Sequence, residues 1–212
     1  MILEVGTRRV FASAVDWPGW CRPGRTEEAA LGALTVYAPR YAVVADRAGV
    51  PFGPSPAYDV EDRVPGDATT EFGAPGTVST VDRAPLTAAA ARRQVALLRG
   101  AWDELDRVAV EAPETLRRGP RGGGRDRDAV VAHVLAAERS YARTVGVKYP
   151  EPAPGDTDAI ESARAALATA LVEVSTVEPL VGRGWPARYA LRRIAWHVLD
   201  HVWEIEDKSP PG

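Results

Sequence analysis

Residues 187–208 read ARYALRRIAWHVLDHVWEIEDK, and this stretch carries the apolar pattern and the polar residues on which the predicted fold depends. It contains His197 and His201, two of the three histidines of the chain. At about 100° per residue, a spacing of four places both imidazoles on one face of a helix, one turn apart. Ile194 and Val202 fall on or beside the same stripe. The stretch therefore predicts an amphipathic helix whose histidines face the protein interior.

The third histidine, His133, lies in another helical stretch of apolar residues. A buried polar ring without a partner costs about 1–3 kcal/mol, so three inward-facing imidazoles need partners. Neutral imidazole is a common ligand of Zn²⁺, Ni²⁺ and Fe²⁺, and two histidines four residues apart on a helix can share one ion. We therefore predict a divalent-metal site (Zn, Ni or Fe) formed by His133, His197 and His201. The alternative is that one or two of these rings simply hydrogen-bond within the core.

Composition limits the class of protein. The chain has 212 residues, 45% of them hydrophobic, with a net charge of −3, and no overall positive field favours nucleic acid. A single cysteine, Cys21, excludes an internal disulfide framework and a cysteine-rich zinc module. No apolar run approaches the roughly 18 residues of a membrane span, and the first residues lack the apolar core of a signal peptide. We expect a cytoplasmic protein with neither nucleic-acid nor membrane partners.

The first quarter of the chain predicts a small α+β module. Residues 2–5 and 8–16 have the pattern of two strands joined by a Gly-Thr turn. A helix begins after Thr26, whose hydroxyl can cap it, and Pro39 is expected to break or kink that helix near residue 38. Residues 58–63 predict a third strand, which gives a β-β-α-β order.

Prolines and glycines alternate between Pro51 and Pro85, where no long helix can form. This composition predicts three parts: an α+β module at 1–65, a Pro/Gly-rich linker at 66–84 and a helical domain at 85–208. The linker is also compatible with an ordered segment that wraps along the helical domain.

Four amphipathic helices are predicted after Pro85. The first begins after Thr87 and ends before Pro113, and the second runs from Asp126 or Asp128 to about residue 145. A third starts at Asp158 and closes at Pro179. Residues 187–208 form the fourth. Helices of this length with modest connections favour an antiparallel four-helix bundle.

Two stretches resemble a known family. RRIAWHVLDHVWEIEDK (192–208) and DAVVAHVLAAERSYA (128–142) resemble the last and second helices of the DinB-like superfamily, over roughly residues 85–208. The resemblance implies a four-helix bundle with an open divalent-metal site and His133, His197 and His201 as its ligands. It also implies thiol-dependent chemistry, because characterised members are S-transferases or maleylpyruvate isomerases that use mycothiol or bacillithiol.

The N-terminal module resembles a different family. The phrase DWPGW, four residues, then RTEEAALGAL (16–34) is similar to the turn and helix start of HicB-like antitoxin domains. Seven residues carry that similarity: Asp16, Pro18, Gly19, Gly24, Thr26, Glu28 and Ala29. Such a domain favours edge pairing or a protein interface. The chain departs here from the DinB-like pattern, so a substrate cannot be carried over.

Together these patterns predict a metal-dependent enzyme acting on a small molecule, specifically a thiol-dependent transferase that uses a low-molecular-weight thiol such as mycothiol. The alternative is a non-enzymatic, metal-stabilised binding protein with an antitoxin-like module. A homodimer is compatible with either.

Arg192 and Arg193 are candidates for binding a carboxylate of the substrate or thiol by bidentate pairing, against the alternative of surface or ion-paired arginines. Glu138, Glu204 and Glu206 are considered as acceptors for imidazole N–H groups, with surface exposure as the favoured alternative. Cys21 lacks an evident activating neighbour and is expected to be a structural thiol.

Overall fold

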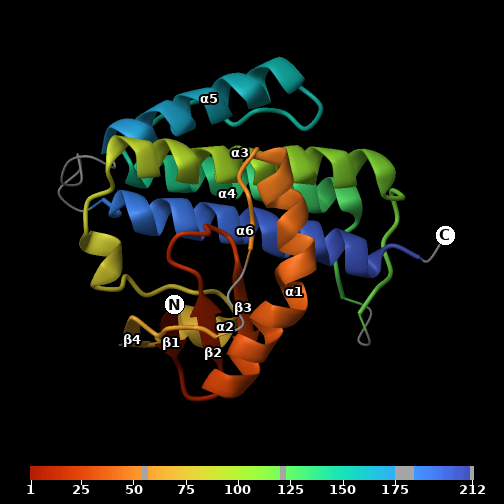
Figure 1. Ribbon diagram of the computed structural model, residues 1–212. Coiled ribbons are helices and arrows are strands. Elements are labelled where there is room, and N and C mark those ends of the chain that lie inside the picture. Colours follow the sequence, from red (N-terminus) through yellow and green to blue (C-terminus); the bar gives the residue numbers. More distant parts are fainter. Residues whose placement is uncertain (54–56, 120–122, 175–183, 211–212) are drawn as a thin grey trace.

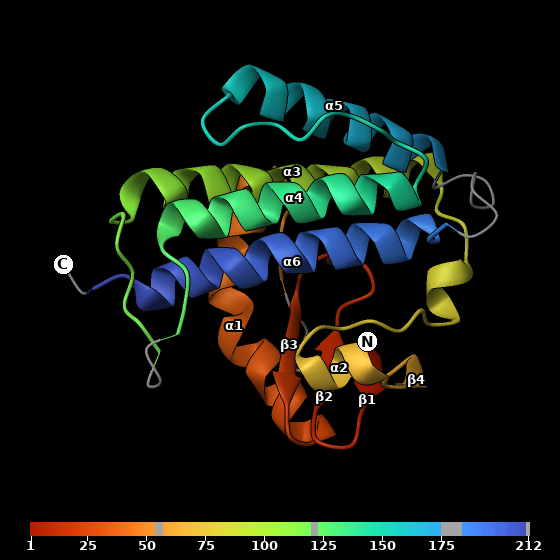
Figure 2. The same ribbon diagram turned by 180° about the vertical axis from the view of Figure 1, so that it is seen from behind.

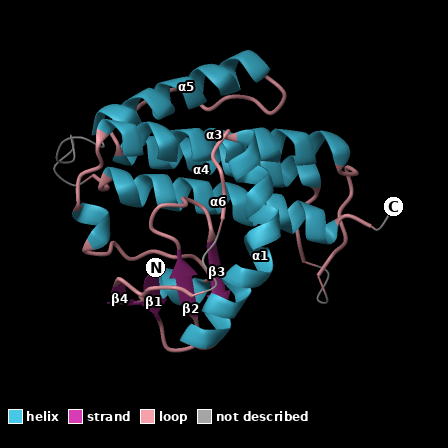
Figure 3. Ribbon diagram, viewed as in Figure 1, coloured by secondary structure: helices cyan, strands magenta, loops and turns pink. Residues whose placement is uncertain are grey.

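The computed structural model describes residues 1–53, 57–119, 123–174 and 184–210. It has mixed α+β architecture, with a small four-stranded sheet near the N-terminus followed mainly by helices. Helices α3 (Ala88–Glu111), α4 (Arg127–Thr144) and α6 (Ala187–Lys208) lie side by side. Helix α5 (Thr157–Val174) lies over α3 and α4, and the sheet with α1 (Glu27–Arg47) lies on the other side of α6 (Figures 1 and 2). Figure 3 separates the helical layers from the strands. No helix in the described ranges is long and apolar enough to cross a membrane.

The sheet contains a strand that was not predicted. Its order is β3-β2-β1-β4, where β1 is Ile2–Val5, β2 is Val10–Ser13, β3 is Cys21–Gly24 and β4 is Asp62–Pro65. β1 pairs antiparallel with β2 and parallel with β4, and β2 pairs antiparallel with β3. The predicted β-β-α-β order is therefore wrong, and the order is β-β-β-α-β.

The turn before β3 explains the extra strand. The Trp20 amide donates to the Trp17 carbonyl, and the Ala14 amide donates to the Trp20 carbonyl, each at 3.0 Å. This tight turn folds the chain back on β2, so that Pro23 and Gly24 are held in a strand that their own preferences disfavour. Proline is tolerated there because β3 is an edge strand and no neighbour needs the missing N–H.

Helix α1 (Glu27–Arg47) continues through Pro39, and the predicted break is wrong. Thr26 caps the helix as predicted, since the Ala29 amide donates to Thr26 Oγ1 at 3.1 Å. An interior proline costs about 3 kcal/mol relative to alanine. Burial of Leu34 and Tyr41, both inaccessible to solvent, offsets that cost by packing α1 against the rest of the core.

Residues 66–84, predicted as a linker, are ordered and contain α2 (Ala68–Phe72) and a 3₁₀ turn, η1 (Val81–Arg83). The amides of Gly76 and Thr77 donate to the carboxylate of Glu4 at 2.9 and 3.0 Å, which fastens the segment to β1. Asp82 in η1 is buried. The segment thus belongs to the packed structure and joins the sheet to the helices.

The later helices follow the predicted positions closely. They are α3 (Ala88–Glu111), α4 (Arg127–Thr144), α5 (Thr157–Val174) and α6 (Ala187–Lys208). Thr87 caps α3, because the Ala90 amide donates to its Oγ1 at 3.2 Å. The expected end of the third helix near Pro179 lies outside the described residues. Local cap chemistry and apolar spacing are sufficient to place these boundaries.

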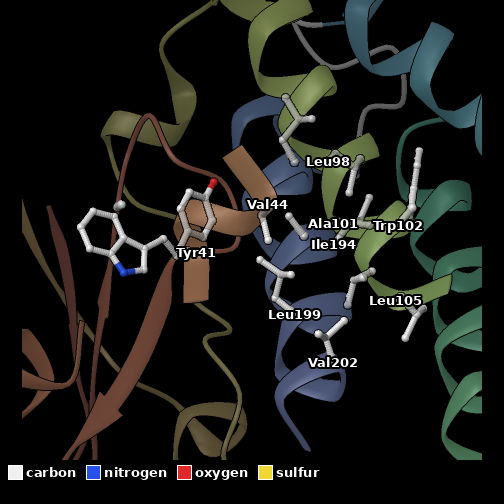
Figure 4. Close-up of a cluster of buried hydrophobic side chains, with 14 of the residues drawn as sticks. Tyr41, Val44, Leu98, Ala101, Trp102, Leu105, Ile194, Leu199 and Val202 are labelled. Atoms are coloured by element: carbon white, nitrogen blue, oxygen red, sulfur yellow. The ribbon is translucent and has the colours of Figure 1, made fainter. Parts of the chain in front are cut away.

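Helix α6 is the centre of the packing. Of its 22 residues, 15 are buried, which means that it is covered on more than one side. Figure 4 shows Ile194, Leu199 and Val202 of α6 meeting side chains of α1 and α3. One hydrophobic cluster contains residues of the sheet, α1 and the later helices. The core therefore runs without interruption from the N-terminal module into the helical part.

Candidate metal centre

The three histidines converge from two helices. His133 is on α4, and His197 and His201 are on α6. Each offers a ring nitrogen within 4.8 Å of the nitrogens offered by the other two. The Nε2 atoms of His133 and His197 are 3.3 Å apart, and the ring centroids of His133 and His201 are 5.0 Å apart. The predicted site residues are thus in one place.

This spacing fits a shared cation. Two nitrogens bound at about 2.0–2.1 Å to a tetrahedral zinc ion are separated by about 3.4 Å, close to the observed 3.3 Å. His197 has its Nε2 toward His133, so that both rings present a ligand atom to the same point. The three side chains therefore have the donor type that a divalent ion requires, and the His133–His197 pair has the spacing.

Helix packing holds the rings in this arrangement. Val130 and Val134 on α4, and Val198 and Val202 on α6, are wholly buried beside the histidines. The two helices are antiparallel, since the amide of Trp185, just before α6, donates to the carbonyl of Thr144 at the end of α4. Close packing of branched side chains leaves little freedom for the flanking backbone. The ring positions are thus set by the core before any ion binds.

Glu204 supports His201 from the next turn of α6. Its Oε2 lies 2.7 Å from His201 Nδ1, and its other oxygen accepts from Lys208. The hydrogen bond with His201 is the main cause that lowers the pKa of Glu204 to about 2. A carboxylate on Nδ1 fixes the tautomer and leaves Nε2 free as a ligand. Of the three glutamates considered from the sequence, only Glu204 contacts a histidine ring.

Burial favours the neutral form of His133 and His197. Burial, reinforced by the neighbouring His201 and Arg193, lowers the pKa of His197 to about 2. Burial also lowers the pKa of His133. Metal ions bind the neutral form of histidine, so protons compete little for these two rings at neutral pH.

Two of the three histidines are not fully buried. His133 is only half-buried, and the side chain of His201 is 12% exposed. Within the described ranges, no fourth histidine, cysteine, aspartate or glutamate joins the cluster. Three protein ligands leave a coordination position for water or a substrate, which is the arrangement of catalytic rather than structural sites.

The two candidate arginines have different environments. Arg192 is buried and directed toward η1, where its Nε and Nη2 donate to the two oxygens of Asp82 at 3.2 and 2.6 Å. Because its guanidinium is paired with Asp82, Arg192 is directed to η1 and not to the histidines. Arg193, one residue further along, lies on the same helix face as His197 and contacts Tyr141 of α4.

Tyr141 was not singled out from the sequence as a site residue. Its ring meets that of His197 edge-to-face, with centroids 5.6 Å apart. The signal was available, because Tyr141 follows His133 by two helical turns and therefore lies on the same face of α4.

Three other candidates make structural contacts away from the histidines. Cys21 is buried, Ser13 Oγ donates to its Sγ at 3.0 Å, and burial raises the pKa of the thiol to about 12. Glu138 is buried at the α3 side of α4, where Trp102 Nε1 donates to it at 2.5 Å and Arg164 lies 3.6 Å away. Glu206 pairs with Arg40 at 2.6 Å. None of these three groups contacts an imidazole of the cluster.

No family model matches this chain, and comparisons with curated proteins and with solved structures find no match either. The resemblances of residues 85–208 and 16–34 to known families therefore stay predictions. What the residues themselves offer is three converging imidazoles, a carboxylate that contacts one of them, and no fourth such ligand among the described residues.

Proposed function

We propose that this chain is a metal-dependent enzyme acting on a small molecule, with a divalent ion (Zn, Ni or Fe) held by His133, His197 and His201. The observation that carries the proposal is the convergence of three imidazoles from α4 and α6 within 4.8 Å, with no fourth such ligand in the described part of the chain. A divalent ion bound there would lower the pKa of a thiol or water that reaches it.

The proposed reaction is thiol transfer to a small electrophile, in a helical bundle of DinB type built from α3 to α6. The thiol has to come from outside the protein, because Cys21 is buried and its pKa of about 12 keeps it protonated at neutral pH. A low-molecular-weight thiol such as mycothiol would meet this need. The half-buried His133 marks the side from which such a molecule would approach.

The residues of the chain have separate parts in this proposal. His133, His197 and His201 hold the ion, and Glu204 orients the ring of His201 through Nδ1. Tyr141 covers one face of the His197 ring and limits the access of water to it.

Metal analysis of the purified full chain tests the proposal. We expect one equivalent of divalent metal in the wild type, less than a tenth of that in His197→Ala and His133→Ala, and a full equivalent in the control Asp128→Asn. Asp128 is an exposed acid on the same helix as His133. In the cobalt-substituted protein, an added thiol should change the visible absorption, and thiol consumption with an electrophile should require the metal. No metal in the wild type, or a full equivalent in His197→Ala, would contradict the assignment.

A metal-stabilised binding protein is the second candidate. It is favoured by the position of the ligands on α6, which also anchors the N-terminal module through the Arg22–Asp200 ion pair at 3.0 Å. In that case the metal should raise the melting temperature, while the cobalt spectrum stays unchanged when thiol is added.

A further inference from the structure

Arg193 is a buried cation with no acidic partner among the described residues. Its side chain is on the interior side of α6, and the residue is only 8% exposed. Within the described ranges its Nη1 is buried and makes no hydrogen bond. A charge held away from water without a partner is unfavourable, so such a group is normally paired or awaits a ligand.

The other buried arginines of the described chain show the usual arrangement. Arg192 forms its bidentate pair with Asp82, and Arg164 pairs with Asp106 at 2.8 Å. Arg193 differs from both, although it is adjacent to Arg192 in the sequence and comparably buried. Its isolation is therefore a local property and not a general feature of arginines in this core.

Aromatic side chains hold the guanidinium of Arg193 in place. Its Cζ lies 4.5 Å from the ring centroid of Trp196 and 5.4 Å from that of Tyr141. The Tyr141 ring is also the one that meets His197, and Arg193 precedes His197 by one turn of α6. Stacking on rings orients the planar group without using its N–H donors, which leaves Nη1 free to bind a ligand.

A second unused donor or acceptor lies one turn away. His197 presents Nε2 to His133, and its Nδ1 is buried without a hydrogen-bond partner in the described part of the chain. Two buried, unpartnered polar groups one turn apart on α6, next to the three histidines, mark a place for a polar ligand.

The charge balance indicates that this ligand is an anion. The three imidazoles would bring no negative charge to a divalent ion, and Arg193 adds a positive charge beside them. Glu204 is the single carboxylate within hydrogen-bond reach of the three rings among the described residues. A site with this excess of positive charge attracts an anionic ligand.

We propose that Arg193 binds a carboxylate of the small molecule on which the protein acts, beside the three histidines. A planar guanidinium pairs with a carboxylate through two parallel hydrogen bonds, which a point charge cannot do. The inference deepens the proposed function, because it assigns carboxylate-bearing compounds as the substrate class. The carboxylate can belong to the thiol or to the electrophile, and the experiment below separates these sources.

Binding of acetate to the metal-free full chain tests Arg193 without relying on the ion. We expect acetate to raise the melting temperature of the wild type and of the control Arg143→Met, which removes an exposed arginine of α4. In Arg193→Met the acetate effect should vanish. Without acetate, this variant should melt at or above the wild-type temperature, because an unpaired buried charge has been replaced by an apolar chain. An equal acetate effect in Arg193→Met would overturn the inference.

The cobalt-substituted protein then identifies the source of the carboxylate. If the thiol carries it, 3-mercaptopropionate should bind at least ten times more tightly than 2-mercaptoethanol, and Arg193→Met should remove that difference. If the two thiols bind alike, acetate should still bind together with 2-mercaptoethanol, which assigns the carboxylate to the electrophile. If acetate binds neither to the metal-free chain nor to the cobalt-substituted protein with 2-mercaptoethanol, the inference is overturned.

The failure of this inference can be told apart from that of the proposed function. A full equivalent of metal in both wild type and Arg193→Met, with no acetate effect in either, rejects the role of Arg193 alone. Absence of metal from the wild type rejects the metal centre, while the acetate measurement on the metal-free chain still decides the role of Arg193. If Arg193→Met fails to fold, Arg193→Lys should keep the charge and the fold but lose most of the acetate effect. An unchanged acetate effect in Arg193→Lys would contradict bidentate binding.

Discussion

His133 on α4 and His197 on α6 place their Nε2 atoms 3.3 Å apart, although 64 residues separate them in the chain. Without an ion, one ring has to donate a hydrogen bond to the other between the two helices. With an ion, both nitrogens can bind that ion, because their spacing suits a tetrahedral site. This one contact connects the packing of the two helices to the proposed chemistry.

Replacing Glu204 by glutamine should weaken metal binding without abolishing it. The carboxylate fixes the His201 tautomer through a 2.7 Å hydrogen bond, and loss of such an outer partner lowers metal affinity about 10- to 100-fold. The dissociation constant can be measured by competition with a chromophoric chelator, with Asp128→Asn as the control. Equal affinities in Glu204→Gln and wild type would contradict the outer role of Glu204.

Arg192→Met should strongly destabilise the protein. It leaves Asp82, which is 1% exposed, as a buried charge without its partner, and breaking such pairs costs about 3–5 kcal/mol. The free energy of unfolding in urea measures the effect. The double variant Arg192→Met, Asp82→Leu should recover much of the loss, because both charges are then gone. A single variant as stable as the wild type would show that the pair does not fasten η1 to α6.

Stability should fall as the pH rises from about 4.5 to about 7, through the contribution of Glu138. Burial raises the pKa of Glu138 from 4.5 to about 7 in the folded protein. In that window the folded state binds a proton that the unfolded state has released, so unfolding becomes easier with increasing pH. Glu138→Gln removes the titrating group. The unfolding free energies of the variant and the wild type should be measured at pH 4 and pH 8. Relative to the wild type, the variant should be more stable at pH 8 than at pH 4. A difference independent of pH would refute this assignment.

Cys21 should be unreactive in the native protein. The thiol is buried, and its pKa of about 12 leaves almost no thiolate at pH 8. Labelling with a chromogenic disulfide reagent should be slow in buffer and complete within minutes in guanidinium. Rapid labelling of the folded chain would show that the thiol is accessible, and would reopen its role as a nucleophile.

The sequence was sufficient where the cause of a structure is local. The bounds of α6 and the caps at Thr26 and Thr87 follow from apolar spacing and hydroxyl chemistry within a few residues. The histidine cluster was predictable for the same reason, because a four-residue spacing fixes one helix face. His133 was expected on the inward face of α4, because it lies among apolar residues at helical spacing.

Tertiary packing decided the features that the sequence did not predict. Residues 21–24 become a strand only because the preceding turn folds them onto β2, and α1 passes Pro39 because its buried face is held on two sides. Arg192 and Arg193 looked alike in the sequence. A rotation of about 100° between adjacent residues directs one to Asp82 and the other to Tyr141, and only the placement of η1 distinguishes them.

X-ray absorption spectroscopy of the metal-loaded full chain tests the central claim most directly. We predict one ion per chain with three imidazole nitrogens at about 2.0–2.1 Å and one exchangeable oxygen or sulfur ligand, and loss of the imidazole signal in His197→Ala. An ion bound without imidazole scattering, or a chain that retains no ion at micromolar metal concentrations, would contradict the account.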